Sequence, residues 1–268
     1  MDIETNGTRI RVKLQGKGEL ALVCLHYHGG SSRTWDAVAG ELADRYRIVA
    51  TDHRGWGDSA APVDGYRIAD LAADAQGVID ALGLQRYVLA GHSMGGKVAQ
   101  LMASRRPRGL EGLVLVAPSP PSPTMLPGEQ HAMLAGAYQS RESVEFVIDH
   151  VLTARKLDAA RREQVIEDSL KGAPQAKAAW PNVAMREDIT EAVVSIDVPT
   201  IVVSGDRDQV DSIASLEAEL LPRIPQAVMH VVPGAGHLLP LEAPTELARI
   251  VGRFAEQIED QRARPEHG

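Results

Sequence analysis

A serine set between two glycines is the residue in this sequence that points most directly to chemistry. In the stretch Gly91–Gly95, the glycines stand two residues before and two residues after Ser93. The apolar run Tyr87–Ala90 precedes this stretch, and an amphipathic segment, Gly96–Arg105, follows it. At a sharp turn from strand to helix, such spacing exposes the serine hydroxyl beside a helix N-terminus, which stabilises developing negative charge. The pattern therefore predicts that Ser93 is a nucleophile.

A serine hydroxyl attacks only when a base takes its proton, and that base needs an acid to orient it. Two later segments offer such partners. The strand-like run Thr200–Val203 is followed closely by Asp206 and Asp208, and the run Val228–Val232 leads into a glycine-rich loop that presents His237. Serine, acid and histidine in this chain order are typical of one class of serine triad. On residue type alone, either aspartate could be the acid.

Short apolar runs alternate with amphipathic segments along most of the chain. Such runs suit strands covered on both faces of a parallel sheet, so the alternation predicts a doubly wound α/β fold. The expected strands are Ala21–Leu25, Ile48–Ala50, Tyr87–Ala90, Leu113–Ala117, Thr200–Val203 and Val228–Val232. The expected helices are Trp35–Asp44, Ile68–Leu82, Gly96–Arg105, Ser212–Leu221 and Pro244–Ile258. Asn6 and Gly7 predict the turn of an N-terminal hairpin.

One long segment breaks the alternation, because no strand-like run occurs between Pro118 and Val198. Two amphipathic helices are expected there, Ser140–Val151 and Asp158–Leu170, the second with Asp158 as its N-cap. The segment is too long for a simple connection between strands, so we interpret it as a helical cap. The expected organisation is a core domain, residues 1–118 and 199–268, with a cap (lid) domain, residues 119–198.

Composition favours a soluble globular protein. Of the 268 residues 44% are hydrophobic, and the formal net charge is −8 without a concentrated basic region. The charge pattern argues against nucleic-acid binding, and no apolar stretch approaches the roughly 20 residues that span a bilayer. The single cysteine, Cys24, lies in an apolar run and is expected to be buried. We expect a cytoplasmic protein, because no signal-peptide pattern is present, and a monomer or homodimer.

In its motifs and their order, the sequence resembles the α/β-hydrolase superfamily over nearly its whole length. The resemblance is carried by Leu25–Trp35, Asp52–Ser59, Gly91–Gly96, Gly205–Asp208 and Gly234–His237. It implies a mostly parallel, eight-stranded sheet with a helical cap inserted after the sixth strand. The acid of this family usually stands three residues after the glycine, which selects Asp208 and leaves Asp206 as a solvated turn residue.

The resemblance also implies an oxyanion hole made of two backbone amides. One belongs to Met94, and the other follows the third strand. His26 aligns with the histidine of the family motif, and Tyr27 stands where glycine is usual, so the second amide is expected at His28. Aligning the motif with His28–Gly30 instead would shift the donor by two residues.

The same loop and the cap are expected to border the substrate pocket, through His26, Tyr27 and Trp180. His26 is also expected to brace its loop by a side-chain hydrogen bond. His26 and His28 could point the same way along a strand and share a metal ion. No Asp, Glu or Cys at ligand spacing accompanies them, so neither a metal nor another cofactor is expected.

These residues predict a carboxylic ester hydrolase that cleaves a small ester or lactone by two-step acyl transfer. A carbon–carbon bond hydrolase, a cofactor-free perhydrolase or a lyase could use the same three residues. An alternative of another class is a ligand receptor that turns over slowly. Such a receptor would hydrolyse short p-nitrophenyl esters poorly and would bind a partner protein only with its ligand present.

Overall fold

The computed structural model describes residues 1–263 as layers of helix around one eight-stranded sheet. The strands are β1 Asp2–Thr5, β2 Thr8–Gln15, β3 Ala21–Leu25, β4 Arg47–Thr51, β5 Tyr87–His92, β6 Leu110–Val116, β7 Thr200–Gly205 and β8 Ala227–Val232. They lie in the order β1-β2-β4-β3-β5-β6-β7-β8. The β1–β2 and β2–β4 pairs are antiparallel and the others are parallel. The mostly parallel sheet predicted from the sequence is therefore confirmed.

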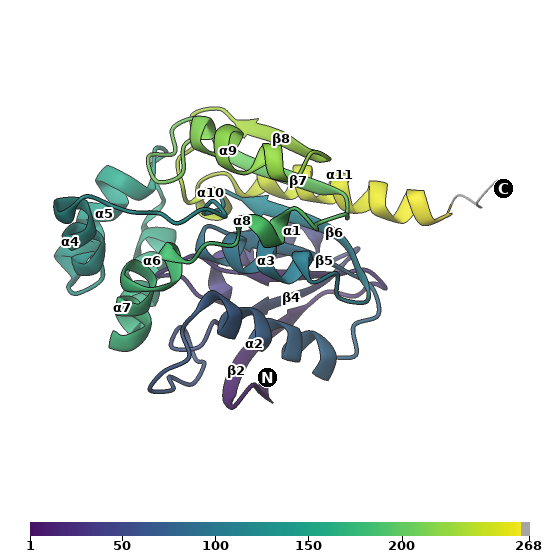
Figure 1. Cartoon of the computed structure of the whole chain (residues 1–268), viewed down its shortest axis with the longest axis horizontal. Helices are drawn as coiled ribbons and strands as arrows, with labels where there is room; N and C mark the ends of the chain where they lie inside the picture. The colour runs from purple at the N-terminus through teal and green to yellow at the C-terminus, as the bar shows by residue number, and fades with distance from the viewer. Residues whose placement is uncertain (264–268) are drawn as a thin grey trace.

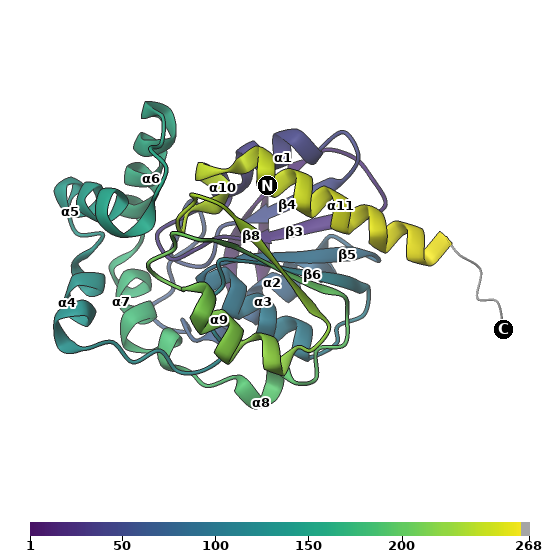
Figure 2. The ribbon, with the colours of Figure 1, turned by 90° about the horizontal axis from the view of Figure 1, so that it is seen from above.

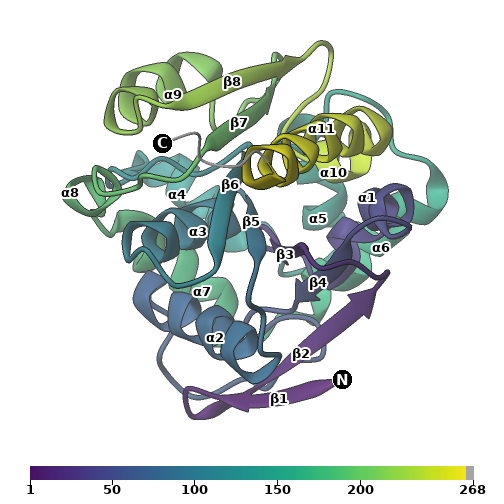
Figure 3. The same cartoon turned by 90° about the vertical axis from the view of Figure 1, so that its right-hand side faces the viewer.

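The central strands are apolar on both faces because helices cover both sides of the sheet. Every residue of β3, β5 and β7 is buried. Figure 3 shows α1 and α11 on one side of the sheet and α2, α3 and α9 on the other. The bounds of these helices are α1 Asp36–Leu42, α2 Ile68–Ala81, α3 Met94–Ser104, α9 Ile213–Glu219 and α11 Pro244–Ala263. The first predicted helix differs at its start, since Ser32–Trp35 forms a 3-10 turn, η1, which Ser31 caps.

The chain between β6 and β7 is helical, as expected. Its elements are α4 Gly128–Gly136, α5 Arg141–Val147, the π-helical turn η2 Ile148–Leu152, α6 Ala159–Lys171, α7 Pro174–Asn182, the 3-10 turn η3 Ala184–Arg186 and α8 Thr190–Val193. Helices α4 to α7 gather at one end of the molecule, away from the far end of α11 (Figures 1 and 2). Asp158 caps α6 by accepting the N–H of Arg161 at 2.8 Å.

From Trp180 in α7 onward, the inserted chain also packs against helices of the core. Trp180, Met185 and Val193 are buried in the same cluster as residues of α2 and α3. The division at residues 119–198 stays a prediction, and residues 264–268 of the predicted core domain lie outside the described residues. Two short helical segments complete the fold, η4 Leu221–Arg223 and α10 Leu239–Glu242. No helix within residues 1–263 is long and apolar enough to cross a membrane.

Helix α3 approaches the ends of the central strands so closely that side chains are excluded between them. A Cβ atom on Gly95 would lie 2.6 Å from the carbonyl oxygen of Leu25 and 2.7 Å from that of His26. A Cβ atom on Gly91 would lie 2.3 Å from the carbonyl oxygen of Gly95. All of these neighbours are backbone atoms, which cannot move aside as a side chain could. The glycine spacing around Ser93 is thus a packing requirement of the fold.

Replacing Gly95 by alanine is expected to lower the free energy of unfolding by about 1–3 kcal/mol, because α3 must move away from β3. Gly40 provides a matched control, since it lies exposed in α1 and a Cβ atom added there would have no neighbour within 4 Å. Gly40→Ala is expected to raise the free energy of unfolding by about 0.5–1 kcal/mol. Urea unfolding of both variants measures the two effects, and equal stabilities would contradict the packing argument.

Candidate active site

Ser93 occupies a strained turn between β5 and α3. Its φ angle of 54° lies in the left-handed region, which residues with a side chain rarely adopt. Its N–H donates to the carbonyl oxygen of Val116 in β6 at 3.0 Å. Its carbonyl oxygen accepts the N–H groups of Gly96 at 2.8 Å and Lys97 at 3.1 Å. A neighbouring strand and the first turn of α3 therefore hold the turn in this conformation.

The structure brings together Ser93, His237 and Asp208, the three residues that the sequence predicts to act in concert. Nε2 of His237 lies 2.9 Å from Oγ of Ser93, and Nδ1 lies 2.8 Å from Oδ2 of Asp208. The other oxygen of Asp208 accepts the N–H groups of Val210 at 2.8 Å and Asp211 at 3.1 Å. The alternative acid, Asp206, instead accepts the N–H of Gly234.

Two opposing effects set the proton affinity of His237. Burial alone would lower the pKa of this imidazole, since only 2% of the residue is exposed. The negative charge of Asp208 and its hydrogen bond outweigh burial, with smaller contributions from Asp211 and Glu242, so the pKa of His237 is raised above its usual value. The carboxylates around His237 thus favour its positively charged form.

The loop that carries His237 is held by side chains and carbonyls from several elements. Glu242, in α10, accepts the N–H groups of Gly236 at 3.0 Å and Leu238 at 3.1 Å, one on either side of His237. Nε2 of His92 must donate to the carbonyl oxygen of His237, 2.8 Å away, because a carbonyl can only accept. Sequence reasoning missed the role of Glu242, because nothing in the pattern separates it from a surface glutamate.

The backbone amides of His28 and of Met94, the residue after Ser93, have no acceptor within residues 1–263. Met94 is the first residue of α3, so no carbonyl of the same helix can reach its N–H. The N–H of Gly30, the donor in the other alignment, is used in a bond of 3.1 Å to the carbonyl oxygen of Tyr27. The hydrogen bonds therefore favour His28 over Gly30 as a donor to a developing oxyanion.

The inserted helices hold the backbone around His28. The hydroxyl of Tyr138, from the α4–α5 connection, donates to the carbonyl oxygen of His28 at 2.9 Å. The hydroxyl of Ser169, in α6, donates to the carbonyl oxygen of Gly29 at 3.0 Å. Gly29 has a φ of 99°, and a Cβ there would lie 2.6 Å from the ring of Tyr138. The inserted chain is thus part of the support of this loop, not only a cover over it.

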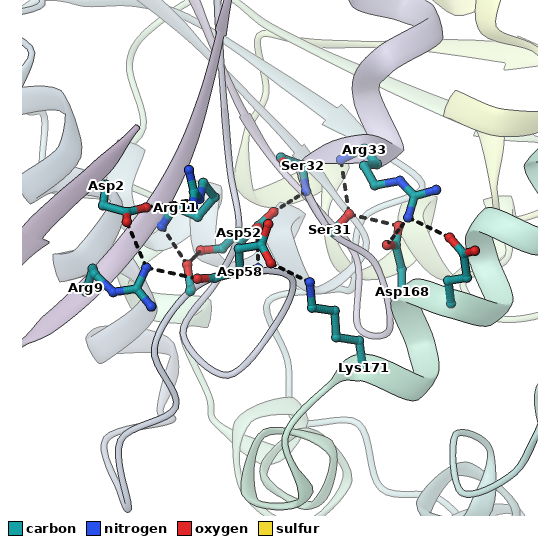
Figure 4. A network of polar contacts seen from close by, with 12 residues as sticks. Asp2, Arg9, Arg11, Ser31, Ser32, Arg33, Asp52, Asp58, Asp168 and Lys171 are labelled. Atoms are coloured by element: carbon teal, nitrogen blue, oxygen red, sulfur yellow. Dashed lines mark hydrogen bonds and ion pairs between the residues drawn. The ribbon is translucent and has the colours of Figure 1, made fainter.

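The next residues of the same loop join a polar network with α6 (Figure 4). Ser31 donates from its hydroxyl to Asp168 at 2.8 Å, and Arg33 contacts the same carboxylate at 3.2 Å. Burial raises the pKa of Asp168 to about 6, although its bond to Ser31 and the charge of Arg33 oppose this rise. Asp52, after β4, accepts the N–H of Ser32 at 2.6 Å. The network fixes the loop to both β4 and α6.

The expectation that His26 borders the pocket is wrong, because His26 is fully buried and does not line the cavity at Ser93. Its Nδ1 donates to the carbonyl oxygen of Tyr27 at 2.6 Å, and its Nε2 accepts the N–H of His53 at 3.0 Å. Burial lowers the pKa of His26 to about 3, so the ring is neutral, as this pair of bonds requires. His26 therefore braces the loop by its side chain.

A cavity of about 400 Å³ opens onto Ser93 and His237 between the sheet and the inserted helices. Tyr27, His28 and Trp180 line it. The remaining walls are mainly apolar and include Leu126, Leu134, Ala137, Val147, Val151, Leu152 and Met185. Asp211 also lines the cavity, and no sequence pattern separates it from the other acidic residues of its loop. Within residues 1–263, no three His, Cys, Asp or Glu side chains are grouped as metal ligands.

Comparisons with known proteins agree with this architecture. A model of the Alpha/beta hydrolase family matches residues 22–250. A non-heme haloperoxidase of Rhodococcus erythropolis is 31% identical over 87% of this chain and 90% of its own. A 2-(acetamidomethylene)succinate hydrolase of Mesorhizobium japonicum is 26% identical over 92% of each chain. The structure of a thermophilic esterase from Thermogutta terrifontis, with malate bound, matches with a TM-score of 0.83 and 26% identity, covering 96% of this chain and 99% of that one.

Replacing Ser93 by alanine is expected to lower kcat for p-nitrophenyl ester hydrolysis by about 10³- to 10⁶-fold, because the attacking oxygen is lost. The melting temperature should change little, since alanine keeps the backbone bonds of the turn. Ser204→Ala is the control, because that buried hydroxyl has no partner within residues 1–263 and does not line the cavity. Near-normal hydrolysis by Ser93→Ala would contradict the assignment of Ser93 as nucleophile.

The raised pKa of His237 predicts the direction of a pH effect. Only the neutral imidazole can take a proton, so kcat/KM should rise with pH through a midpoint above about 6.5. Asp208→Asn removes the negative charge that raises the pKa of His237 against the effect of burial. The midpoint should therefore fall, and kcat should drop by about 10³- to 10⁴-fold. Asp206→Asn should leave the midpoint unchanged, and pH–rate profiles of the three proteins test this order.

Proposed function

This chain belongs to the alpha/beta hydrolase family, and on that premise we propose that it hydrolyses a small carboxylic ester or lactone. The observation that carries the proposal is the chain of hydrogen bonds from Ser93 through His237 to Asp208, with distances of 2.9 and 2.8 Å. A serine linked to a buried, carboxylate-paired histidine is the arrangement that acyl transfer requires.

The proposed reaction begins as His237 takes the proton of Ser93 and Ser93 Oγ attacks the carbonyl carbon. The N–H groups of Met94 and His28 stabilise the negative oxygen of the tetrahedral intermediate. His237 then gives its proton to the departing alkoxide, which leaves as an alcohol or, from a lactone, stays attached to the acyl chain. Water, deprotonated by His237, attacks the acyl-enzyme and releases the acid, which restores the Ser93 hydroxyl.

The walls of the cavity support a small and mostly uncharged substrate. Its volume of about 400 Å³ accommodates a compact molecule, and aliphatic side chains such as Leu134, Val147 and Met185 dominate its surface. His28 adds no positive charge, because burial, with a smaller effect of Lys177, lowers the pKa of its ring to about 3. The substrate is thus expected to be held by apolar contact and oriented by a few polar groups.

Perhydrolysis is a second candidate, favoured by the likeness to the non-heme haloperoxidase over most of both chains. In that reaction hydrogen peroxide replaces water as the attacking molecule, and the acyl-enzyme yields a peracid instead of an acid. The same three residues would serve both reactions. For either reaction, we propose that the binding partner is a small-molecule ester or lactone. We also propose that the protein is cytoplasmic and is a monomer or a homodimer.

An active-site label and a substrate panel together test the proposal. A fluorophosphonate should add one label to the wild-type protein, at Ser93, and none to Ser93→Ala, as measured by intact mass and peptide mapping. Esters and lactones of graded acyl length should then show a maximum in kcat/KM at the length that fills the cavity. Absence of both labelling and turnover would contradict hydrolysis, and peracid formation exceeding hydrolysis in acetate and peroxide would favour the second candidate.

A further inference from the structure

One carboxyl group in the cavity has no partner among the residues that the structure describes. Asp211, in the loop between β7 and α9, is only 8% exposed and lines the same cavity as Ser93 and His237. Its backbone N–H donates to Asp208, but no hydrogen bond or ion pair within residues 1–263 uses its carboxyl oxygens. Asp208, three residues earlier, differs in that its oxygens are engaged by His237, by Val210 and by Asp211 itself.

An unpaired carboxyl group in a mainly apolar cavity is unfavourable unless a ligand or water meets it. Burial accordingly raises the pKa of Asp211 to about 7. The negative charge of Asp208 raises this pKa further, while the charges of His237 and of Lys97, in α3, lower it. No side-chain hydrogen bond within residues 1–263 ties Asp211 to the sheet or to its loop, so its carboxyl group is available to a group that enters the cavity.

Resting on the proposed hydrolysis, we propose that Asp211 is a specificity-determining residue that accepts a hydrogen bond from a hydroxyl or amide N–H group of the substrate. The substrate is then an ester or lactone that is apolar except for one neutral donor near the bond to be cleaved. An analogue that lacks the donor leaves the buried carboxyl group unpaired, which is the condition under which hydrogen-bonding sites discriminate strongly.

Charged groups fit this position less well than neutral donors. A carboxylate on the substrate would lie beside Asp211, with Asp208 nearby in the same loop, and would be repelled. An ammonium group would lie beside His237, which becomes positively charged when it takes the proton of Ser93, and within the influence of Lys97. The neutral donor satisfies Asp211 without disturbing the charge that develops during attack.

Matched esters test this inference. Butyl butyrate lacks a donor, butyl 3-hydroxybutyrate carries one in its acyl part, and 4-hydroxybutyl butyrate carries one in its alcohol part. The wild-type protein should prefer one of the hydroxylated esters to butyl butyrate by about 10- to 100-fold in kcat/KM. In Asp211→Leu this ratio should fall to near one, and in Asp211→Asn, which keeps an acceptor oxygen, it should fall only in part.

The ratio of kcat/KM between a hydroxylated ester and butyl butyrate separates recognition of the hydroxyl group by Asp211 from an indirect effect of Asp211 on the pKa of His237. Losing the charge of Asp211 lowers the pKa of His237 for all three esters alike, so that effect cancels in the ratio. Val210→Ala is the matched control, because it alters the neighbouring lining residue without removing a polar group and should keep the wild-type ratio. A wild-type ratio near one, or an equal ratio in the wild type and Asp211→Leu, would overturn the inference.

Binding to inactive protein keeps this result separate from failure of the proposed function. The same esters can be titrated by calorimetry into Ser93→Ala and into Ser93→Ala combined with Asp211→Leu. Tighter binding of a hydroxylated ester to the first protein, lost in the second, supports the role of Asp211 even if the wild type hydrolyses none of them. Equal preferences in the two proteins would overturn that role, whatever the hydrolysis assay gives.

Discussion

The close approach of α3 to the ends of the central strands is the constraint on which the site depends. Gly91 and Gly95 permit it, because any side chain there would meet backbone atoms. The approach forces Ser93 into a left-handed conformation, with a φ of 54°. Hydrogen bonds to β6 and to the first turn of α3 stabilise this strained conformation. Met94, the residue after Ser93, begins the helix, so its N–H has no acceptor within the helix.

The inserted helices complete the second half of the site. Tyr138 and Ser169 hold the carbonyl groups of His28 and Gly29, and the N–H of His237 donates to the carbonyl oxygen of Leu152, in η2, at 3.0 Å. The proposed base and the proposed second oxyanion donor are therefore both attached to the inserted chain. A change in the position of these helices would therefore alter the positions of His237 and His28 as well as the shape of the cavity.

Two aspartates of one short loop, Asp208 and Asp211, differ in the hydrogen bonds that their carboxyl groups accept. Asp208 accepts hydrogen bonds from two N–H groups and contacts His237, so its carboxylate can stabilise the imidazolium. Asp211 has the opposite character, since it is buried at the cavity and its carboxyl group has no partner in the described part of the chain. One position supports the base and the other remains available to a ligand, although the two residues are chemically identical.

The sequence by itself indicated the main strands and helices of the core together with Ser93 and His237, and its resemblance to a known family selected Asp208 over Asp206. These features can be predicted because a strand buried on both faces is a continuous apolar run, and because a sharp turn or a close approach of backbone requires glycine. Only the tertiary structure decided that His26 lies behind the loop, that Glu242 holds the segment around His237, and that Asp211 faces the cavity. Those roles depend on contacts between segments far apart in the chain, and a single aspartate or histidine carries no local pattern that distinguishes a supporting side chain from an exposed one.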